Sequence, residues 1–361
     1  MTAKASILTR DNSLVLRGVA ILFIVLHNFL HIPTYGFSGE NEMSFSSENA
    51  DSFFNTITGG SNLIGEFFSH LGWIGVPVFV FLTGYGIALA PPPLCDCKSA
   101  NYIKRSYLKL LALMLPALLF FAGVDVIKGC LWPDLLKRFS YLTMLANFAY
   151  PFVRCSPGVY WYFGLTFQFY LLWALLGRHL NWKNLLIWSV ILLAGLYGFS
   201  AFGTPVSLSI FRHCFTGWFP VFAIGVWLGL SKRGDNVVPT KSIWMELLLF
   251  VALFALIILF GKWMFSWLFI PIIALGWFIV LGLMLLRTCY ISVIFRWVGK
   301  YSACIFVSHP IARLIINNAL QPRLSNLLAL VLMYIALTIG IALLYDKLYK
   351  WLLGVFMPKT K

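Results

Sequence analysis

Long apolar runs alternate with short polar connections along almost the whole chain. Each run is about as long as the roughly 20 residues that an α-helix needs to cross a bilayer. Unbroken runs of this kind predict helices, because a transmembrane β-barrel shows alternating segments of about ten residues instead. The ten predicted spans are 14–31, 73–90, 107–124, 158–177, 184–202, 214–230, 243–260, 266–286, 300–318 and 325–345.

Composition supports this interpretation. Of the 361 residues, 60% are hydrophobic and only 11% are charged, against about 25% charged residues in soluble domains. So few charges cannot cover a water-exposed surface, which excludes soluble, disordered and fibrous proteins. We therefore predict an all-α, polytopic integral membrane protein. No region outside the apolar runs is large enough for a soluble domain, so residues 1–361 are predicted to form a single transmembrane domain.

The distribution of charge predicts the topology. The loop 32–72 holds five acidic residues and neither Lys nor Arg, so we expect it outside the membrane. The stretch 139–150 is apolar but short, and most of the 27 Lys and Arg fall on the cytoplasmic side only if it does not cross. We predict a re-entrant or interfacial segment near 139–150 and both termini in the cytoplasm. The net charge of +15 then reflects cytoplasmic loops and gives no reason to expect nucleic acid.

Ionisable side chains inside spans are costly, so they usually face a cavity or a partner. In the first span, Arg17 marks the cytoplasmic end, and His27 lies about 15 Å deeper by the helical rise. His31 follows four residues later on the same helical face, and Asn28 adds a further polar group. The alternative is that these histidines only form hydrogen bonds within the core.

A second histidine lies at a similar depth in the ninth span. His309 is nine residues beyond Lys300 at the cytoplasmic end, and Arg313 follows it by one helical turn. Imidazole accepts or releases a proton near neutral pH, so His27 and His309 indicate a reaction centre or a proton path near the midplane. Two unrelated core histidines remain the alternative.

Two further groups of polar residues are candidates for binding. Thr166, Gln168 and Tyr170 lie within the fourth span, where Gln either orients a hydroxyl substrate or bonds a neighbouring helix. The residues Lys104, Arg105 and Lys109 precede or enter the third span. They are either ordinary cytoplasmic charge or an anchor for a phosphorylated ligand. No nucleotide-binding motif and no Cys/His cluster for a metal is present in the sequence.

Four segments resemble acyltransferase family 3, whose members O-acylate bacterial surface sugars. LRGVAILFIVLHNFLH resembles the family's first span, and WIGVPVFVFLTGYGIA its GV-x-x-FF-x-x-SGF span. YWYFGLTFQFYLLWALL resembles W-F-L-x-x-E-x-x-FY, and VGKYSACIFVSHP resembles GK-x-SY-x-IYL-x-H-P. The segments occur in this order between residues 14 and 316, which covers most of the chain.

The resemblance implies transfer of an acyl group, usually acetyl, from cytosolic acyl-CoA to a hydroxyl of a glycan or glycolipid at the outer face of the bacterial inner membrane. It implies that His27 is the base and that Arg17 helps hold CoA. Lys104, Arg105 and Lys109 would hold the CoA phosphates, while His309, Arg313 and the polar residues of the fourth span complete the site. No metal is implied.

The chain departs from the family pattern at three places. Only nine residues separate Arg17 from His27, so Asn28 occupies the usual histidine position, and either His27 or His31 is the base. Thr166 stands where the family has Glu, and the basic residues are spaced differently. The rival hypothesis is a proton-coupled transporter or flippase of a lipid or saccharide, although no inverted repeat is evident. Membrane lipid is an expected partner, and nothing in the sequence indicates an oligomer.

Overall fold

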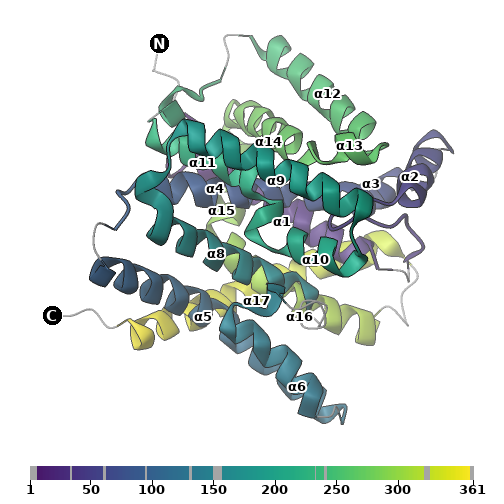
Figure 1. Cartoon of the computed structure of the whole chain (residues 1–361). Helices are drawn as coiled ribbons and strands as arrows, with labels where there is room; N and C mark the ends of the chain where they lie inside the picture. The colour runs from purple at the N-terminus through teal and green to yellow at the C-terminus, as the bar shows by residue number, and fades with distance from the viewer. Residues whose placement is uncertain are drawn as a thin grey trace. The chain divides into compact units, whose positions relative to one another are not determined.

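In the computed structural model, helices are the only regular secondary structure among the described residues, with no strand among them (Figure 1). The structure describes residues 6–32, 35–59, 62–93, 96–129, 132–148, 157–231, 233–239, 242–320 and 326–357. The predicted all-α, polytopic membrane fold is confirmed.

The described residues form two compact units. Unit 1 comprises those within 1–90, 181–208 and 218–302, and unit 2 those within 91–180, 209–217 and 303–361. The prediction of a single transmembrane domain stays a prediction.

Unit 1 contains the N-terminal helices and most of the helices between residues 181 and 302. Its elements are α1 (Ser13–Leu30), α2 (Ser47–Gly59), α3 (Leu63–Leu71), η2 (Gly72–Gly75), α4 (Val76–Ala88), α9 (Trp182–Phe202), α11 (Phe219–Leu230), η8 (Arg233–Asn236), α12 (Ile243–Phe260), α13 (Met264–Trp267), α14 (Ile270–Leu286) and α15 (Cys289–Lys300).

Unit 2 contains the two longest helices, which are α5 and α17. Its elements are α5 (Asp96–Ile127), α6 (Trp132–Phe139), η3 (Ser140–Thr143), η4 (Ala146–Phe148), η5 (Gly158–Tyr160), α8 (Trp161–Leu176), η6 (Gly177–His179), η7 (Phe215–Gly217), α16 (Ser302–Ile315), the π-helical turn η9 (Ile316–Leu320) and α17 (Leu327–Phe356). Helix α10 (Pro205–His213) contributes its first residues to unit 1 and its last to unit 2.

Each of the ten predicted spans coincides largely with a helix. Among the described residues, seven continuous helical segments are long and apolar enough to cross a membrane, α11 and α14 are shorter apolar helices, and α15 and α16 qualify only when taken together. The predicted second span began at residue 73, whereas the structure extends this apolar helical segment back to Leu63. Polar residues at 66, 69 and 70 interrupt the apolar run, so the sequence does not predict this extension.

The stretch 139–150 is not a spanning helix. It follows α6 as the two 3₁₀ turns η3 and η4, and residues 149–150 lie outside the described residues. Such short turns suit an interfacial or re-entrant position, because they leave backbone groups that a lipid core would not satisfy.

Glycines bring pairs of helices in unit 1 into backbone contact. A Cβ atom at Gly84 of α4 would lie 2.4 Å from the carbonyl oxygen of Phe222 in α11, and one at Gly225 would lie 2.2 Å from that of Phe81. A Cβ at Gly18 of α1 would lie 2.1 Å from the carbonyl oxygen of Phe295 in α15. The pairs α4–α11 and α1–α15 pack closely for this reason.

Candidate active site

His27 lies on α1 in unit 1 and is 3% exposed. Its Nδ1 lies 3.1 Å from the carbonyl oxygen of Phe68 in α3. Because a carbonyl oxygen only accepts hydrogen bonds, Nδ1 of the neutral ring carries the hydrogen. Nε2 then holds the free lone pair, which is the arrangement that a general base requires.

Close packing fixes the position of the His27 ring. A Cβ atom on Gly72 would lie 2.6 Å from Cβ of His27, so η2 rests directly against α1 at this level. His31 stacks on His27, with ring centroids 4.7 Å apart and planes inclined by 13°. The predicted placement of both histidines on one face of the first span is therefore confirmed by the helix.

The other predicted residues of the first span lie on the same helix. Arg17 is half-buried, ten residues before His27. Asn28 is buried, and its Nδ2 donates to the carbonyl oxygen of Ile24 at 2.9 Å, one turn earlier in the same helix. This bond engages one amide hydrogen of Asn28 within α1, and a substrate-binding role for Asn28 stays a prediction.

Sequence reasoning missed two polar residues of α3. Glu66 and His70 are 6% and 2% exposed and lie one helical turn apart. Glu66 Oε2 accepts a hydrogen bond from the Ser38 amide at 2.9 Å, and His70 Nδ1 donates to the carbonyl oxygen of Gly39 at 2.7 Å. His70 is also close enough to His27 for their charges to interact. The signal in the sequence was their spacing of four within an apolar segment.

His309 lies on α16 in unit 2 and is fully buried. By hydrogen-bond geometry, neither ring nitrogen has a partner among the residues that the structure describes, although the backbone carbonyl groups of Ile305 and Phe306 lie close to the ring. Phe306 is an aromatic neighbour, with ring centroids 5.6 Å apart. Arg313, one turn further along α16, interacts electrostatically with His309 and Tyr160. A buried imidazole of this kind favours a ligand or an ordered water as its partner.

The predicted polar residues of the fourth span lie on α8, also in unit 2. Thr166 Oγ1 donates to the carbonyl oxygen of Tyr162 at 2.8 Å, within the helix. Gln168 Oε1 accepts from the amide of Phe215 at 2.8 Å, so this side chain joins α8 to η7. The Tyr170 ring packs edge-on against Tyr102 of α5, with centroids 6.1 Å apart. Thr166 and Gln168 therefore form hydrogen bonds within the protein. A role for them in substrate binding stays a prediction.

The basic residues Lys104, Arg105 and Lys109 lie along α5 and are exposed. No ion pair joins any of the three to an acidic residue in the described part of the chain. Exposed cations without a carboxylate partner suit a phosphorylated ligand.

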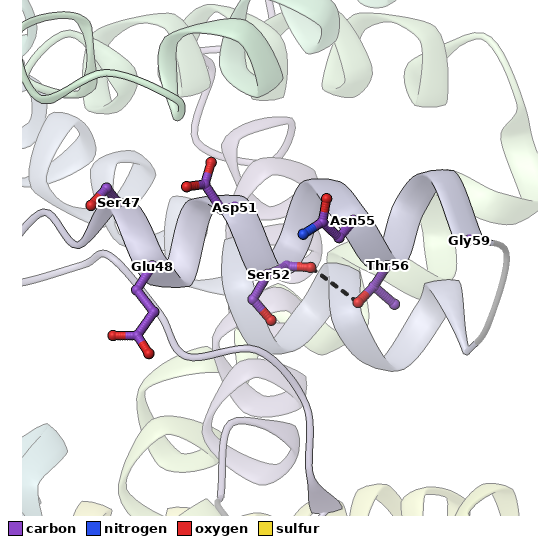
Figure 2. Close-up of a pocket in the computed structure, with 7 residues that line it drawn as sticks. All are labelled: Ser47, Glu48, Asp51, Ser52, Asn55, Thr56 and Gly59. Carbon is purple, nitrogen blue, oxygen red and sulfur yellow. Dashed lines mark hydrogen bonds between the residues drawn. The ribbon is translucent and has the colours of Figure 1, made fainter.

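An open hollow of about 750 Å³ lies along one face of α2 (Figure 2). All of its lining residues belong to that single helix, and they are Ser47, Glu48, Asp51, Ser52, Asn55, Thr56 and Gly59. The opposite face of α2 buries Ala50 and Phe53. Figure 2 shows the polar side chains spread along the exposed helix, and we assign this surface no role.

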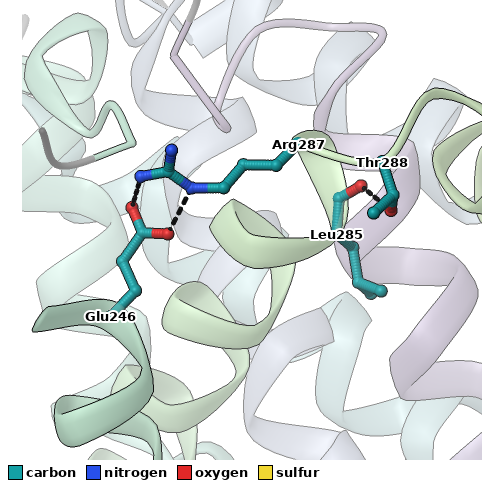
Figure 3. A network of polar contacts seen from close by, with 4 residues as sticks. All are labelled: Glu246, Leu285, Arg287 and Thr288. Atoms are coloured by element: carbon teal, nitrogen blue, oxygen red, sulfur yellow. Dashed lines mark hydrogen bonds and ion pairs between the residues drawn. The ribbon is translucent and has the colours of Figure 1, made fainter. Parts of the chain in front are cut away.

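A buried ion pair joins α12 to the end of α14 in unit 1 (Figure 3). Arg287 Nε lies 2.7 Å from Oε2 of Glu246, and a second nitrogen lies 2.8 Å from Oε1. This bidentate bond raises the pKa of the Arg287 guanidinium above its usual value. We interpret the pair as structural, because it holds two helices together.

Among the described residues, no group of three or more His, Cys, Asp or Glu side chains is arranged to hold a metal ion.

Comparison with known proteins identifies the family. No curated protein and no solved structure gives a match to this chain. A family model described as an acyltransferase domain, acyltransferase 3, matches residues 14–346. This match covers nearly the whole chain and all four segments that carry the sequence resemblance, so the chain belongs to acyltransferase family 3.

Proposed function

We propose that this membrane acyltransferase moves an acyl group, most simply acetyl, from cytosolic acyl-CoA to a hydroxyl of a cell-surface glycan or glycolipid. The observation that carries the proposal is the hydrogen bond between His27 Nδ1 and the carbonyl oxygen of Phe68. It leaves Nε2 of a buried imidazole available as a base, in a protein of an acyltransferase family.

In the proposed reaction, His27 Nε2 takes the proton of the acceptor hydroxyl as its oxygen attacks the thioester carbonyl. The carbon–sulfur bond breaks, the new ester forms, and the proton passes from His27 to the departing CoA thiolate. Atoms and charge therefore balance without a metal or an oxidant. No acyl-enzyme intermediate is required by this scheme, although a covalent step would use the same lone pair.

The remaining predicted residues receive binding roles. Arg17 and the exposed cations of α5 would hold the phosphates of CoA, because both kinds of side chain pair well with phosphate. On the family resemblance, His309 and Arg313 receive binding roles as well. We further propose that the protein lies in the bacterial inner membrane with both termini in the cytoplasm, as the charge distribution predicts.

The test is thiol release from acetyl-CoA by the detergent-purified protein, with and without a saccharide acceptor. We expect slow hydrolysis or transfer in the wild type and its loss in His27→Ala. Asp51→Asn, an exposed substitution on α2, is the control for purification and handling. If the wild type neither releases thiol nor binds acetyl-CoA by calorimetry, the proposal is wrong, and a transporter or flippase becomes the better hypothesis.

A further inference from the structure

Helix α15 of unit 1 carries an exposed apolar stripe. The opposite face of the helix is buried at Ser292, Val298 and Gly299. The members of the stripe are each at least 42% exposed, and they are Tyr290, Val293, Ile294 and Trp297. Because they are spaced by three or four residues, they lie on one helical face. A helix with one exposed apolar face is suited to the surface of a bilayer.

The position of α15 agrees with such a surface location. Its 12 residues rise about 18 Å, whereas the hydrocarbon core of a bilayer is about 30 Å thick. Both of its ends lie near the N-terminal end of α1. It begins shortly after α14, in which Gly282 packs against Leu16 of α1, and a Cβ atom at Gly299 would collide with the carbonyl oxygen of Leu14. Helix α15 therefore crosses the end of α1 that the charge distribution predicts to be cytoplasmic.

Aromatic side chains and a lysine mark the C-terminal end of α15. Trp297 packs edge-on against Tyr301, with ring centroids 5.3 Å apart. Lys300 Nζ lies 5.4 Å from the centroid of the Tyr301 ring. Trp and Tyr concentrate at the level of the lipid headgroups, and Lys extends its ammonium group toward water there while its stem stays apolar. This combination indicates the membrane interface.

Two cations, Arg296 and Lys300, lie one helical turn apart beside the stripe. A terminal guanidinium nitrogen of Arg296 donates to Oδ1 of Asn12 at 2.9 Å. The Nε of Arg296 is buried and has no hydrogen-bond partner in the described part of the chain. Neither cation forms an ion pair with an acid among the described residues, and Asp11, beside Asn12, is exposed. Because like charges at this spacing repel, an anion that contacts both cations is favoured.

We propose that α15 lies in the membrane interface and binds an anionic phospholipid. The acyl chains cover the apolar stripe, and the headgroup phosphate accepts hydrogen bonds from Arg296 Nε and Lys300 Nζ. A lipid accounts for the stripe and the cations together, whereas a soluble phosphate accounts only for the cations. This inference is independent of the proposed function, because it requires no acyl transfer.

The test is native mass spectrometry of the detergent-purified full-length protein, which resolves individual bound lipids. We expect phosphatidylglycerol to bind more tightly than phosphatidylcholine. In the variant carrying Arg296→Gln and Lys300→Gln, the apparent Kd for phosphatidylglycerol should rise about tenfold, with binding of phosphatidylcholine unchanged. The matched control carries Lys183→Gln and Lys347→Gln, which remove the same charge at two exposed positions.

Further measurements keep this test decisive. Thermal unfolding without lipid shows whether the double variant folds, and Lys300→Gln alone, at an exposed position, replaces it if it does not. Phosphatidylglycerol should raise the Tm of the wild type and not that of the variant, because a ligand of the folded state stabilises it. Equal affinity of variant and control for phosphatidylglycerol overturns the proposal. Equally tight binding of glycerophosphoglycerol, the headgroup without acyl chains, overturns the lipid as the ligand.

The depth of α15 is measured separately in vesicles of phosphatidylglycerol and phosphatidylcholine. A nitroxide is attached to Ile294→Cys in a background whose seven cysteines are replaced by Ser or Ala, and its collisions with oxygen and with a nickel chelate are compared. Val251→Cys, exposed near the middle of α12, gives the reference for the hydrocarbon core. We expect Ile294→Cys to lie at headgroup level. Equal depths of the two labels would place α15 within a broken span and overturn the interfacial position.

Discussion

His31 stacks on His27 and also donates from Nδ1 to the His27 backbone carbonyl, 2.9 Å away. The second histidine is therefore oriented by the first, within one helix. His27 is buried, whereas His31 is half-exposed beyond the end of α1. His27 is also held from a second helix, through its bond to the Phe68 carbonyl oxygen of α3. The deeper burial of His27 and its bond to α3 favour His27 over His31 as the base, a choice that the sequence left open.

We predict that substitution of His27 abolishes catalysis and that substitution of His31 only weakens it. His27→Gln removes the lone pair on a fixed ring, so kcat should fall by about 10²–10⁴. His31→Gln removes a stacking neighbour, and the loss should stay below about tenfold. Thiol release from acetyl-CoA measures both variants. A greater loss in His31→Gln than in His27→Gln would assign the base to His31.

The exposed cations of α5 should affect the donor more than the chemistry. In the variant carrying Lys104→Gln and Arg105→Gln, charge-assisted bonds to CoA phosphates are lost, so KM for acetyl-CoA should rise about tenfold with kcat little changed. Measuring KM of the wild type and the double variant with 3′-dephospho-acetyl-CoA shows whether these cations hold the 3′-phosphate. Lys347→Gln, at an exposed position of α17, is the control. An unchanged KM would make these residues ordinary cytoplasmic charge.

The sequence predicts the helices better than the site. Apolar runs determine which segments are helical, and the spacing of four places His27 beside His31. The positions of the Glu66 and His70 side chains depend instead on contacts between α3 and the segment around Gly39. Ser38 and Gly39 form hydrogen bonds with this helix. Such contacts between distant segments have no periodic signal. Gln168 shows the same limit, because its bond to Phe215 is visible only in the fold.

The contact between α4 and α11 should be sensitive to a single methyl group. In Gly84→Ala the added Cβ would meet the carbonyl oxygen of Phe222 at 2.4 Å, and the helices must separate. Overpacking of this kind costs about 1–3 kcal/mol, which thermal unfolding in detergent would detect as a lower Tm. Gly86→Ala lies in the same helix with open space around it. It should leave Tm unchanged or raise it slightly.

Substitution of the two residues of the Glu246–Arg287 ion pair should lower the stability of the protein by unequal amounts. The Glu246 side chain is 1% exposed, whereas that of Arg287 is 25% exposed. Arg287→Ala removes the ion-pair partner of a buried carboxylate, so we expect a loss of up to about 3–5 kcal/mol. Glu246→Gln leaves a guanidinium that can reach water, and the loss should be smaller. Unfolding midpoints of the two variants give the order. The reverse order would mean that Arg287 is the more deeply desolvated partner.

Tyr345 of α17 inserts its hydroxyl group into the hydrogen-bond ladder of α5. The hydroxyl oxygen accepts from the Ala117 amide at 3.0 Å and donates to the carbonyl oxygen of Leu113 at 2.7 Å. In an undisturbed α-helix these two backbone groups would bond each other. Pro116 lies between them and lacks an N–H group, so the ladder is already interrupted at this turn, which is where side chains insert into bent helices.

We therefore predict that Tyr345→Phe destabilises unit 2 through its backbone. Removal of the hydroxyl leaves a buried amide and a buried carbonyl without their partner, which costs about 1–3 kcal/mol. Amide hydrogen exchange should accelerate locally in α5 around Ala117, and Tm should fall. Tyr349→Phe, one turn later on α17, is the matched control, because no hydrogen bond of its hydroxyl joins it to α5 among the described residues. Equal effects of the two variants would show that ring packing, rather than the inserted hydroxyl, joins α17 to α5.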